Sequence, residues 1–212
     1  YLAEGAVVNA FARTAGVPVH VVDVGVDHAF GEARGLVRAK VRRGTRDVLA
    51  DEAMTHDELA EARQTGRRVF ASTRPDVLLV GEMGIGNTTS SAMVMASVAG
   101  LDADAVVGRG TGVSDEALAR KRDVVARGLA KHATRDALEA LRRLGGYEIA
   151  ALVGAIEAAS EARVPVVLDG FITCVAALVA VSIDSSVKDV LIASHVGAER
   201  AHRALLALLD LE

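Results

Sequence analysis

Short apolar runs and longer amphipathic stretches alternate along the chain. Runs bounded by Gly, Pro or Asp predict buried strands at residues 19–24, 77–80, 105–107, 164–168 and 189–193. Stretches with apolar residues at helical spacing predict helices at 2–15, 55–65, 92–99, 114–131, 135–144, 148–162 and 171–182, with a last one ending at 209. Strands joined by helices indicate right-handed βαβ crossovers. We therefore expect residues 1–212 to form a single α/β domain, with a doubly wound (Rossmann-like), mainly parallel sheet of about five to six strands and helices on both faces.

Composition narrows the functional classes. The chain has 212 residues, of which 51% are hydrophobic, and a formal net charge of −4, which argues against a nucleic-acid surface. The longest apolar run, 171–183, is too short to cross a bilayer, so no membrane association is expected. Cys174 is the single cysteine, which excludes an internal disulfide and favours a reducing, cytoplasmic location. With no H-x-x-x-H pair and no second cysteine, we expect no metal site.

The first candidate for chemistry is the glycine-rich segment 81–89, GEMGIGNTT, between a predicted strand and a predicted helix. Glycines let the backbone approach a ligand, and amides at a helix start favour an anion. The spacing is that of a triphosphate loop, but Asn87 stands where that loop has its lysine, so a monophosphate or carboxylate is the better ligand. The alternative is a packing turn without a ligand. The carboxylate of Glu82 inside the turn favours a chemical role over a packing turn.

A second glycine-rich segment, GRGTG at 108–112, follows the predicted strand 105–107. Ser114 is expected to cap the next helix, which places Lys121 about two turns in, where its side chain could reach back toward a phosphate. From the spacing alone, a solvated Lys121 without a role in binding is favoured over a phosphate-binding one. Because the fold gathers the carboxyl ends of its strands at one edge, we expect the segments beginning at Asp23, Gly81, Gly108, Asp169 and Ser194 to lie near one another. His195 could be an acid–base group or ligand, although a capping or core-edge role is the simpler expectation.

Several of these blocks resemble nicotinate-nucleotide–dimethylbenzimidazole phosphoribosyltransferase, a pentosyltransferase that assembles the lower nucleotide loop of cobalamin. The blocks are GEMGIGNTT at 81–89, GRGTG at 108–112 with Lys121, GGYEI at 145–149 and LDGF at 168–171. The resemblance extends through VDVGV at 22–26, RRGT at 42–45 and AMT at 53–55, and so covers nearly all of the chain.

The resemblance implies transfer of the phosphoribosyl group of nicotinate mononucleotide to dimethylbenzimidazole, with release of nicotinate and α-ribazole phosphate. It implies that 84–88 and 108–112, with Lys121, cradle the phosphate, that Glu82 faces the reacting bases, and that Asp169 and Gly170 line the ribose. The substrate contacts that it implies are Met83, Gly84, Ile85, Gly86, Asn87, Thr88, Gly108, Gly110, Thr111, Gly112, Lys121, Asp169, Gly170 and Ser194. No metal or organic cofactor is implied, and family members are homodimers with the ring pocket near the subunit contact.

Three departures from the family pattern leave two functional hypotheses open. The family's principal general-base glutamate belongs to a Leu-Gly-Glu-Gly-type segment that would lie beyond Glu212, and we also expect the family's N-terminal region to be absent from these residues. Gly197 stands where the family usually has a serine that contacts the ribose. The chain is therefore either the core of a complete enzyme or a reduced homologue that binds a nicotinate or α-ribazole nucleotide without turnover. A dinucleotide-binding dehydrogenase ranks last, because Gly108, Gly110 and Gly112 give G-x-G-x-G rather than G-x-G-x-x-G.

Overall fold

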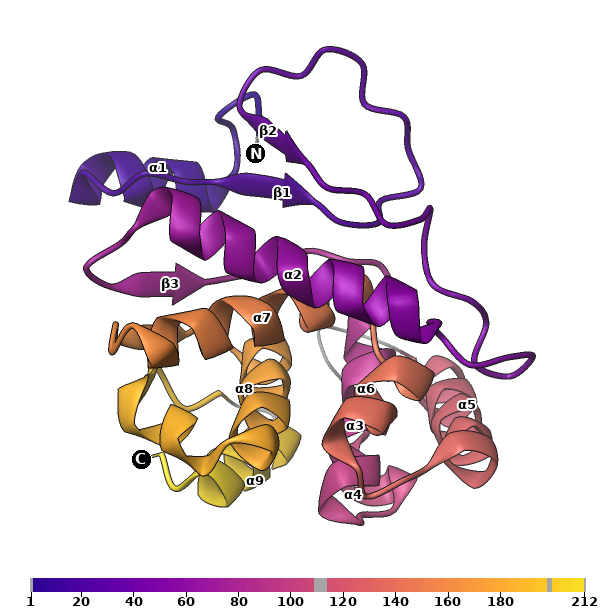
Figure 1. Cartoon of the computed structure of the whole chain (residues 1–212). Helices are drawn as coiled ribbons and strands as arrows, with labels where there is room; N and C mark the ends of the chain where they lie inside the picture. Colours follow the sequence, from indigo (N-terminus) through magenta and orange to yellow (C-terminus); the bar gives the residue numbers. More distant parts are fainter. Residues whose placement is uncertain (1, 109–113, 198–199, 212) are drawn as a thin grey trace.

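The computed structural model describes residues 2–108, 114–197 and 200–211. In these residues five short strands form two parallel sheets. One sheet pairs β1 (Val21–Asp23) with β2 (Leu36–Arg38). The other has the order β3 (Leu78–Val80), β4 (Val166–Leu168), β5 (Leu191–Ala193). The α/β class with parallel strands is therefore confirmed (Figure 1).

Helices make up most of the described chain (Figure 1). They are α1 (Val7–Ala15), α2 (His56–Thr73), α3 (Asn87–Ala99), α4 (Ala103–Val106), α5 (Asp115–His132), α6 (Ala137–Leu144), α7 (Tyr147–Glu161), α8 (Phe171–Ile183), the 3-10 helix η1 (Ser185–Val190) and α9 (Arg200–Leu209). The spacing of Thr55 and Glu58, three residues apart, predicts a capping box, and the structure confirms it at the start of α2. The side chain of Thr55 accepts a hydrogen bond from the Glu58 amide, and the Glu58 side chain accepts one from the Thr55 amide. Ser114 caps α5 as expected.

The strands differ from the expected ones in three respects. The strands form two sheets rather than one, and β2 lies in a segment whose irregular pattern predicted no strand. Residues 105–107 do not form a strand: Ala105 lies in the short helix α4, and Val107 leaves it in an extended conformation. A short apolar run does not distinguish a strand from a single helical turn, and alanine favours the helix.

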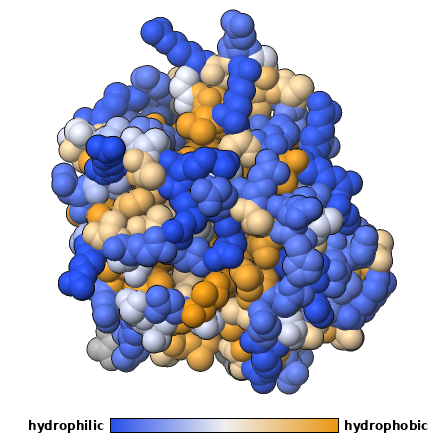
Figure 2. Space-filling view, viewed as in Figure 1, coloured by the Kyte–Doolittle hydropathy of each residue, from blue (hydrophilic) through white to orange (hydrophobic). Residues whose placement is uncertain are grey.

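The larger sheet is buried on one face only. Val80, Val166, Leu168 and Leu191 are buried, whereas Leu79 is 60% and Ile192 50% exposed. Within the described residues, helices therefore do not cover both faces of this sheet, contrary to the expectation. The space-filling view shows apolar side chains lying between polar ones at the surface (Figure 2).

The core is centred on the apolar helices α7 and α8. Helix α2 lies across α7, and the two backbones touch because each contributes a glycine at the crossing (Figure 1). A Cβ on Gly66 would lie 1.8 Å from the carbonyl oxygen of Ala151, and one on Gly154 would lie 2.0 Å from that of Arg63. An ion pair of 2.6 Å between Arg63 and Glu157 flanks this crossing. The crossing fixes the position of α7, whose first turn reaches the candidate site.

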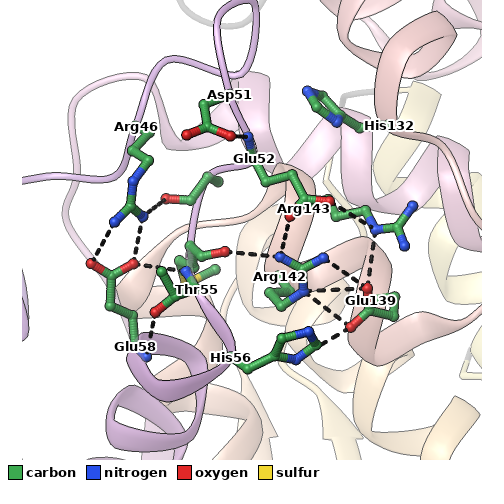
Figure 3. A network of polar contacts seen from close by, with 12 residues as sticks. Arg46, Asp51, Glu52, Thr55, His56, Glu58, His132, Glu139, Arg142 and Arg143 are labelled. Carbon is green, nitrogen blue, oxygen red and sulfur yellow. Dashed lines mark hydrogen bonds and ion pairs between the residues drawn. The ribbon is translucent and has the colours of Figure 1, made fainter.

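A polar network fastens the segment before α2 to α6 (Figure 3). The buried guanidinium of Arg142 donates to Glu139 at 2.9 Å, to the carbonyl of Met54 at 3.1 Å and to Glu52. The hydrogen bond from Arg142, followed by the one from Arg143, lowers the pKa of Glu139 to about 2. The network stabilises the fold.

None of the helices in the described part of the chain is both long enough and apolar enough to cross a membrane.

Candidate functional site

The candidate site forms where three neighbouring strands end. In the parallel register Val80 pairs with Leu168 and Leu168 pairs with Ala193, so Gly81, Asp169 and Ser194 follow at one edge of the β3–β4–β5 sheet. The Ser194 hydroxyl donates to the carbonyl oxygen of Asp169 at 2.9 Å and ties two of these ends together.

The other two segments expected at this edge do not follow strands of this sheet. Asp23 ends β1 in the smaller sheet, where its carboxylate accepts bonds from the amides of Gly25 and Val26 and pairs with Lys40 at 2.6 Å. Its partners give it a structural role. Gly108 follows α4, and the predicted contacts Gly110, Thr111 and Gly112 lie outside the described residues.

The turn between β3 and α3 has an open backbone. Gly86 is the N-cap of α3 with a φ of +83°, a left-handed conformation that side chains disfavour, and a Cβ on Gly81 or Gly86 would meet nothing within 4 Å. The side chains of Met83 and Ile85 are exposed. A ligand therefore has access to the backbone of the turn itself.

The first amides of α3 are only partly available to that ligand. The Asn87 amide donates to Gly84 at 3.4 Å, and the amides of Thr89 and Ser90 share the carbonyl of Gly86 at 2.9 and 3.3 Å. Asn87 is the first residue of the helix, after the N-cap Gly86, and its side chain donates to Glu82. The helix dipole and a nearby cation must therefore contribute to any anion binding.

Lys121 provides that cation. Its ammonium nitrogen donates to the hydroxyl oxygen of Thr88 at 3.1 Å, across 33 positions of sequence. Sequence spacing alone favoured a solvated lysine; the fold instead directs it to the first turn of α3. A positive charge two residues into a helix N-terminus reinforces the field that attracts an anion.

The carboxyl group of Glu82 has a pKa close to neutral pH. Burial, followed by the charges of Glu148 and Asp169, raises its pKa to about 7, against the hydrogen bond from Asn87. A carboxyl with such a pKa can accept and return a proton near physiological pH. The sequence predicts roles for Glu82 and Asp169 but none for Glu148.

Glu148 lies in the first turn of α7, and burial raises its pKa too. Its carboxylate folds back over the helix start, where a Cβ on Gly146 would lie 2.5 Å from its Oε1. The sequence signal was the pair Gly145-Gly146 followed by an acidic residue, a common helix start. That signal locates a cap but does not reveal proximity to Glu82.

The ribose side predicted from the resemblance consists of Asp169, Gly170 and Ser194. Gly170 begins α8 with extended backbone, and its amide donates to the Thr173 hydroxyl at 3.0 Å. Ser194 also contacts His195, whose Nδ1 lies 2.9 Å from the Ser194 oxygen. Both side chains are exposed and available to a polar ligand.

Two other features bear on what the site can hold. Among the described residues no group of three His, Cys, Asp or Glu side chains is arranged to bind a metal. A cavity of about 510 Å³ lies beside Gly108, lined by α4 and α5, but neither Glu82 nor Lys121 lines it. The candidate catalytic and binding side chains therefore lie at the open edge of the sheet and not in that cavity.

The chain is similar to known phosphoribosyltransferases along its whole length. A family profile described as Phosphoribosyltransferase matches residues 1–212. Nicotinate-nucleotide–dimethylbenzimidazole phosphoribosyltransferase of Geobacter sulfurreducens is 44% identical over 97% of this chain and 60% of its own length. The protein of that name from Deinococcus radiodurans is 46% identical over 98% of this chain and 58% of its own length.

Solved structures give the same result. The crystal structure of CobT from Thermus thermophilus superposes with a TM-score of 0.94 at 41% identity, covering 100% of this chain and 65% of that one. The chain thus spans about 60% of the length of these curated relatives. With a profile match along its whole length, the chain belongs to the phosphoribosyltransferase family.

Proposed function

We propose that this chain binds nicotinate mononucleotide and transfers its phosphoribosyl group to dimethylbenzimidazole, giving α-ribazole phosphate and nicotinate in cobalamin biosynthesis. The observation that carries the proposal is the contact between Lys121 and Thr88 at the start of α3, beside the carboxyl of Glu82. A cation, the N-terminus of a helix and a carboxyl group that can accept a proton thus lie together at one edge of the sheet.

In this proposal the phosphate lies against the backbone of 84–88 and the ammonium of Lys121. Segment 108–112 would complete the cradle, and Asp169, Gly170 and Ser194 would face the ribose. A nitrogen lone pair of the base attacks the anomeric carbon, and the bond from that carbon to nicotinate breaks with its electron pair leaving on nicotinate. The attacking ring then loses its N–H proton, for which Glu82 is the acceptor in this chain.

Electrostatics and positioning supply the rest of the catalysis. As nicotinate leaves, positive charge develops on the ribose, and the carboxylates at this edge stabilise it. Glu82, Glu148 and Asp169 form that negative field, as the effect of the latter two on the pKa of Glu82 indicates. Holding both rings in line across one carbon removes much of the entropic barrier.

Chromatography of a reaction with both substrates tests the proposal. The enzyme hypothesis predicts that α-ribazole phosphate and nicotinate form in equal amounts, and that Glu82→Gln reduces their rate by about a hundredfold. Substrate consumption without a nucleotide product would contradict it.

The second candidate function is nucleotide binding without turnover. The chain covers 60% of the length of the Geobacter sulfurreducens relative, so binding by these residues and turnover are tested separately. This hypothesis predicts heat of binding for nicotinate mononucleotide in calorimetry and no product. The two readouts together distinguish the hypotheses.

The proposal also includes a cytoplasmic homodimer. One cysteine in the whole sequence rules out an internal disulfide, which accords with a reducing compartment. The exposed side chains of Leu79 and Ile192 on the open sheet face, and of Phe11 on α1, offer apolar surface to a second subunit. Light scattering after gel filtration is expected to give twice the chain mass; a single chain mass at micromolar concentration would contradict the dimer.

A further inference from the structure

A buried histidine on α9 contacts the loop that follows β5. His202 is 2% exposed, and its Nδ1 lies 3.1 Å from the amide nitrogen of Gly197. Its Nε2 lies 3.5 Å from the sulfur of Cys174 on α8. The ring thus joins three elements: α8, α9 and the loop that carries Ser194 and His195.

The chemistry of the partners fixes the arrangement of protons in the neutral ring. The Gly197 amide can only donate, so Nδ1 accepts and the proton lies on Nε2, facing the sulfur. Burial raises the pKa of the Cys174 thiol to about 12, so that sulfur stays protonated and acts only as a weak partner. The bond to Gly197 is therefore the stronger of the two and the one that acts on the loop.

The fit at Gly197 is close. A Cβ on Gly197 would lie 2.3 Å from His202 Nδ1, so the backbone approaches the ring as only glycine allows. The rings of His195 and His202 meet edge to face with centroids 5.5 Å apart. Two contacts, one to the backbone and one to a side chain, thus set the course of residues 194–197.

We propose that His202 is a positioning residue: it holds the loop after β5 so that Ser194 and His195 face the carboxyl edge of the sheet. Ser194 is bonded in turn to the carbonyl of Asp169, so a displaced loop would also disturb the end of β4. The effect on substrate rests on the proposed function, whereas the effect on the loop does not.

Two substitutions of His202 separate the contact of Nδ1 with Gly197 from the contact of Nε2 with Cys174. His202→Asn keeps an acceptor near the place of Nδ1, and His202→Gln keeps a polar group near the place of Nε2. We expect amide hydrogen exchange at Gly197 to stay close to that of the unsubstituted chain in H202N and to accelerate at least about tenfold in H202Q. Equal exchange in the two variants would overturn the proposal.

The substrate readout follows the same division. For H202Q we expect the KM for nicotinate mononucleotide to rise about tenfold with kcat within about twofold, and for H202N both to stay near the original values. Gly197→Ala, which displaces the loop from the other side, is expected to behave as H202Q does even if both His202 variants fold poorly. Cys174→Ser is the control and should leave Gly197 exchange unchanged.

The results also separate this proposal from the proposed function. If the unsubstituted chain forms no product but Gly197 exchange distinguishes H202N from H202Q, the positioning stands and the activity fails. If product forms at the same KM in H202N, H202Q and Gly197→Ala, the positioning fails and the activity stands.

Discussion

At the scale of single residues, Glu82 shows how an environment makes an ordinary side chain chemically useful. Its pKa of about 7 arises first from burial and then from the charges of Glu148 and Asp169. Neither cause can be predicted from the sequence, which shows only an acidic residue within a glycine-rich turn. Its neighbours come from other strand and helix ends, brought together by the sheet.

The raised pKa makes a prediction about stability. Because the folded state holds the Glu82 proton more tightly than the unfolded chain does, its contribution to stability is lost as pH rises from 4.5 toward 7. Relative to Glu82→Gln, the unfolding free energy of the original chain should fall by on the order of 2 kcal/mol between pH 4.5 and pH 8. Urea unfolding of both proteins at the two pH values measures this; a constant difference would refute it.

Glu148 makes a second prediction at this scale. Glu148→Gln removes a negative charge near Glu82 and should lower the midpoint of the Glu82 titration, while burial keeps it above 4.5. Carbon-13 NMR of the Glu82 carboxyl follows that midpoint directly. Asp57→Asn, in the first turn of α2, is the control and should leave it unchanged. An unchanged midpoint in E148Q would remove Glu148 from the site.

At the scale of elements, the crossing of α2 and α7 positions the first turn of α7. Gly154→Ala would place a methyl 2.0 Å from the carbonyl oxygen of Arg63, so the helices must separate. Alanine normally favours a helix over glycine by about 1 kcal/mol, and overpacking here should outweigh that preference.

We therefore expect G154A to lower the unfolding free energy by about 2 kcal/mol or more. Gly31→Ala is the control, since a Cβ there meets nothing within 4 Å. Denaturant unfolding compares the two, and equal stabilities would show that the crossing adapts at little cost.

The elements also show what could be predicted from sequence. The capping box at Thr55, the cap at Ser114 and the strand before Gly81 depend on local chemistry, and the structure confirms them. The helix at Ala105 was missed because a short apolar run does not distinguish a strand from a single helical turn, and β2 was missed because it depends on its pairing with β1. The Lys121 contact likewise needs the packing of α5 beside α3.

At the scale of the whole molecule, ion pairs join segments far apart in the chain. Arg142 on α6 binds Glu52 across 90 positions, and Glu139 gains a pKa of about 2 from the same network. A lowered pKa contributes stability that is present above 4.5 and is lost as pH falls toward about 2.

Arg142→Met leaves these carboxylates without their main partner and should cost about 3 kcal/mol near pH 7, although Arg143 retains contacts with both. The cost should shrink below pH 4, where the carboxylates take up protons. Arg127→Met, at a surface pair 61% exposed on both sides, should cost less than about 1 kcal/mol at either pH. A cost in R142M that does not change with pH would contradict the account.

The central claim is that the turn after β3 and Lys121 together bind the phosphate of a nucleotide. Calorimetric titration of nicotinate mononucleotide, with free nicotinate as the comparison ligand, tests it most directly in the original chain, Lys121→Ala and Arg127→Ala. We predict that K121A weakens the binding of the mononucleotide at least about tenfold and leaves the binding of nicotinate unchanged. R127A should change neither affinity. Equal losses for both ligands in K121A, or no loss for either, would contradict the claim.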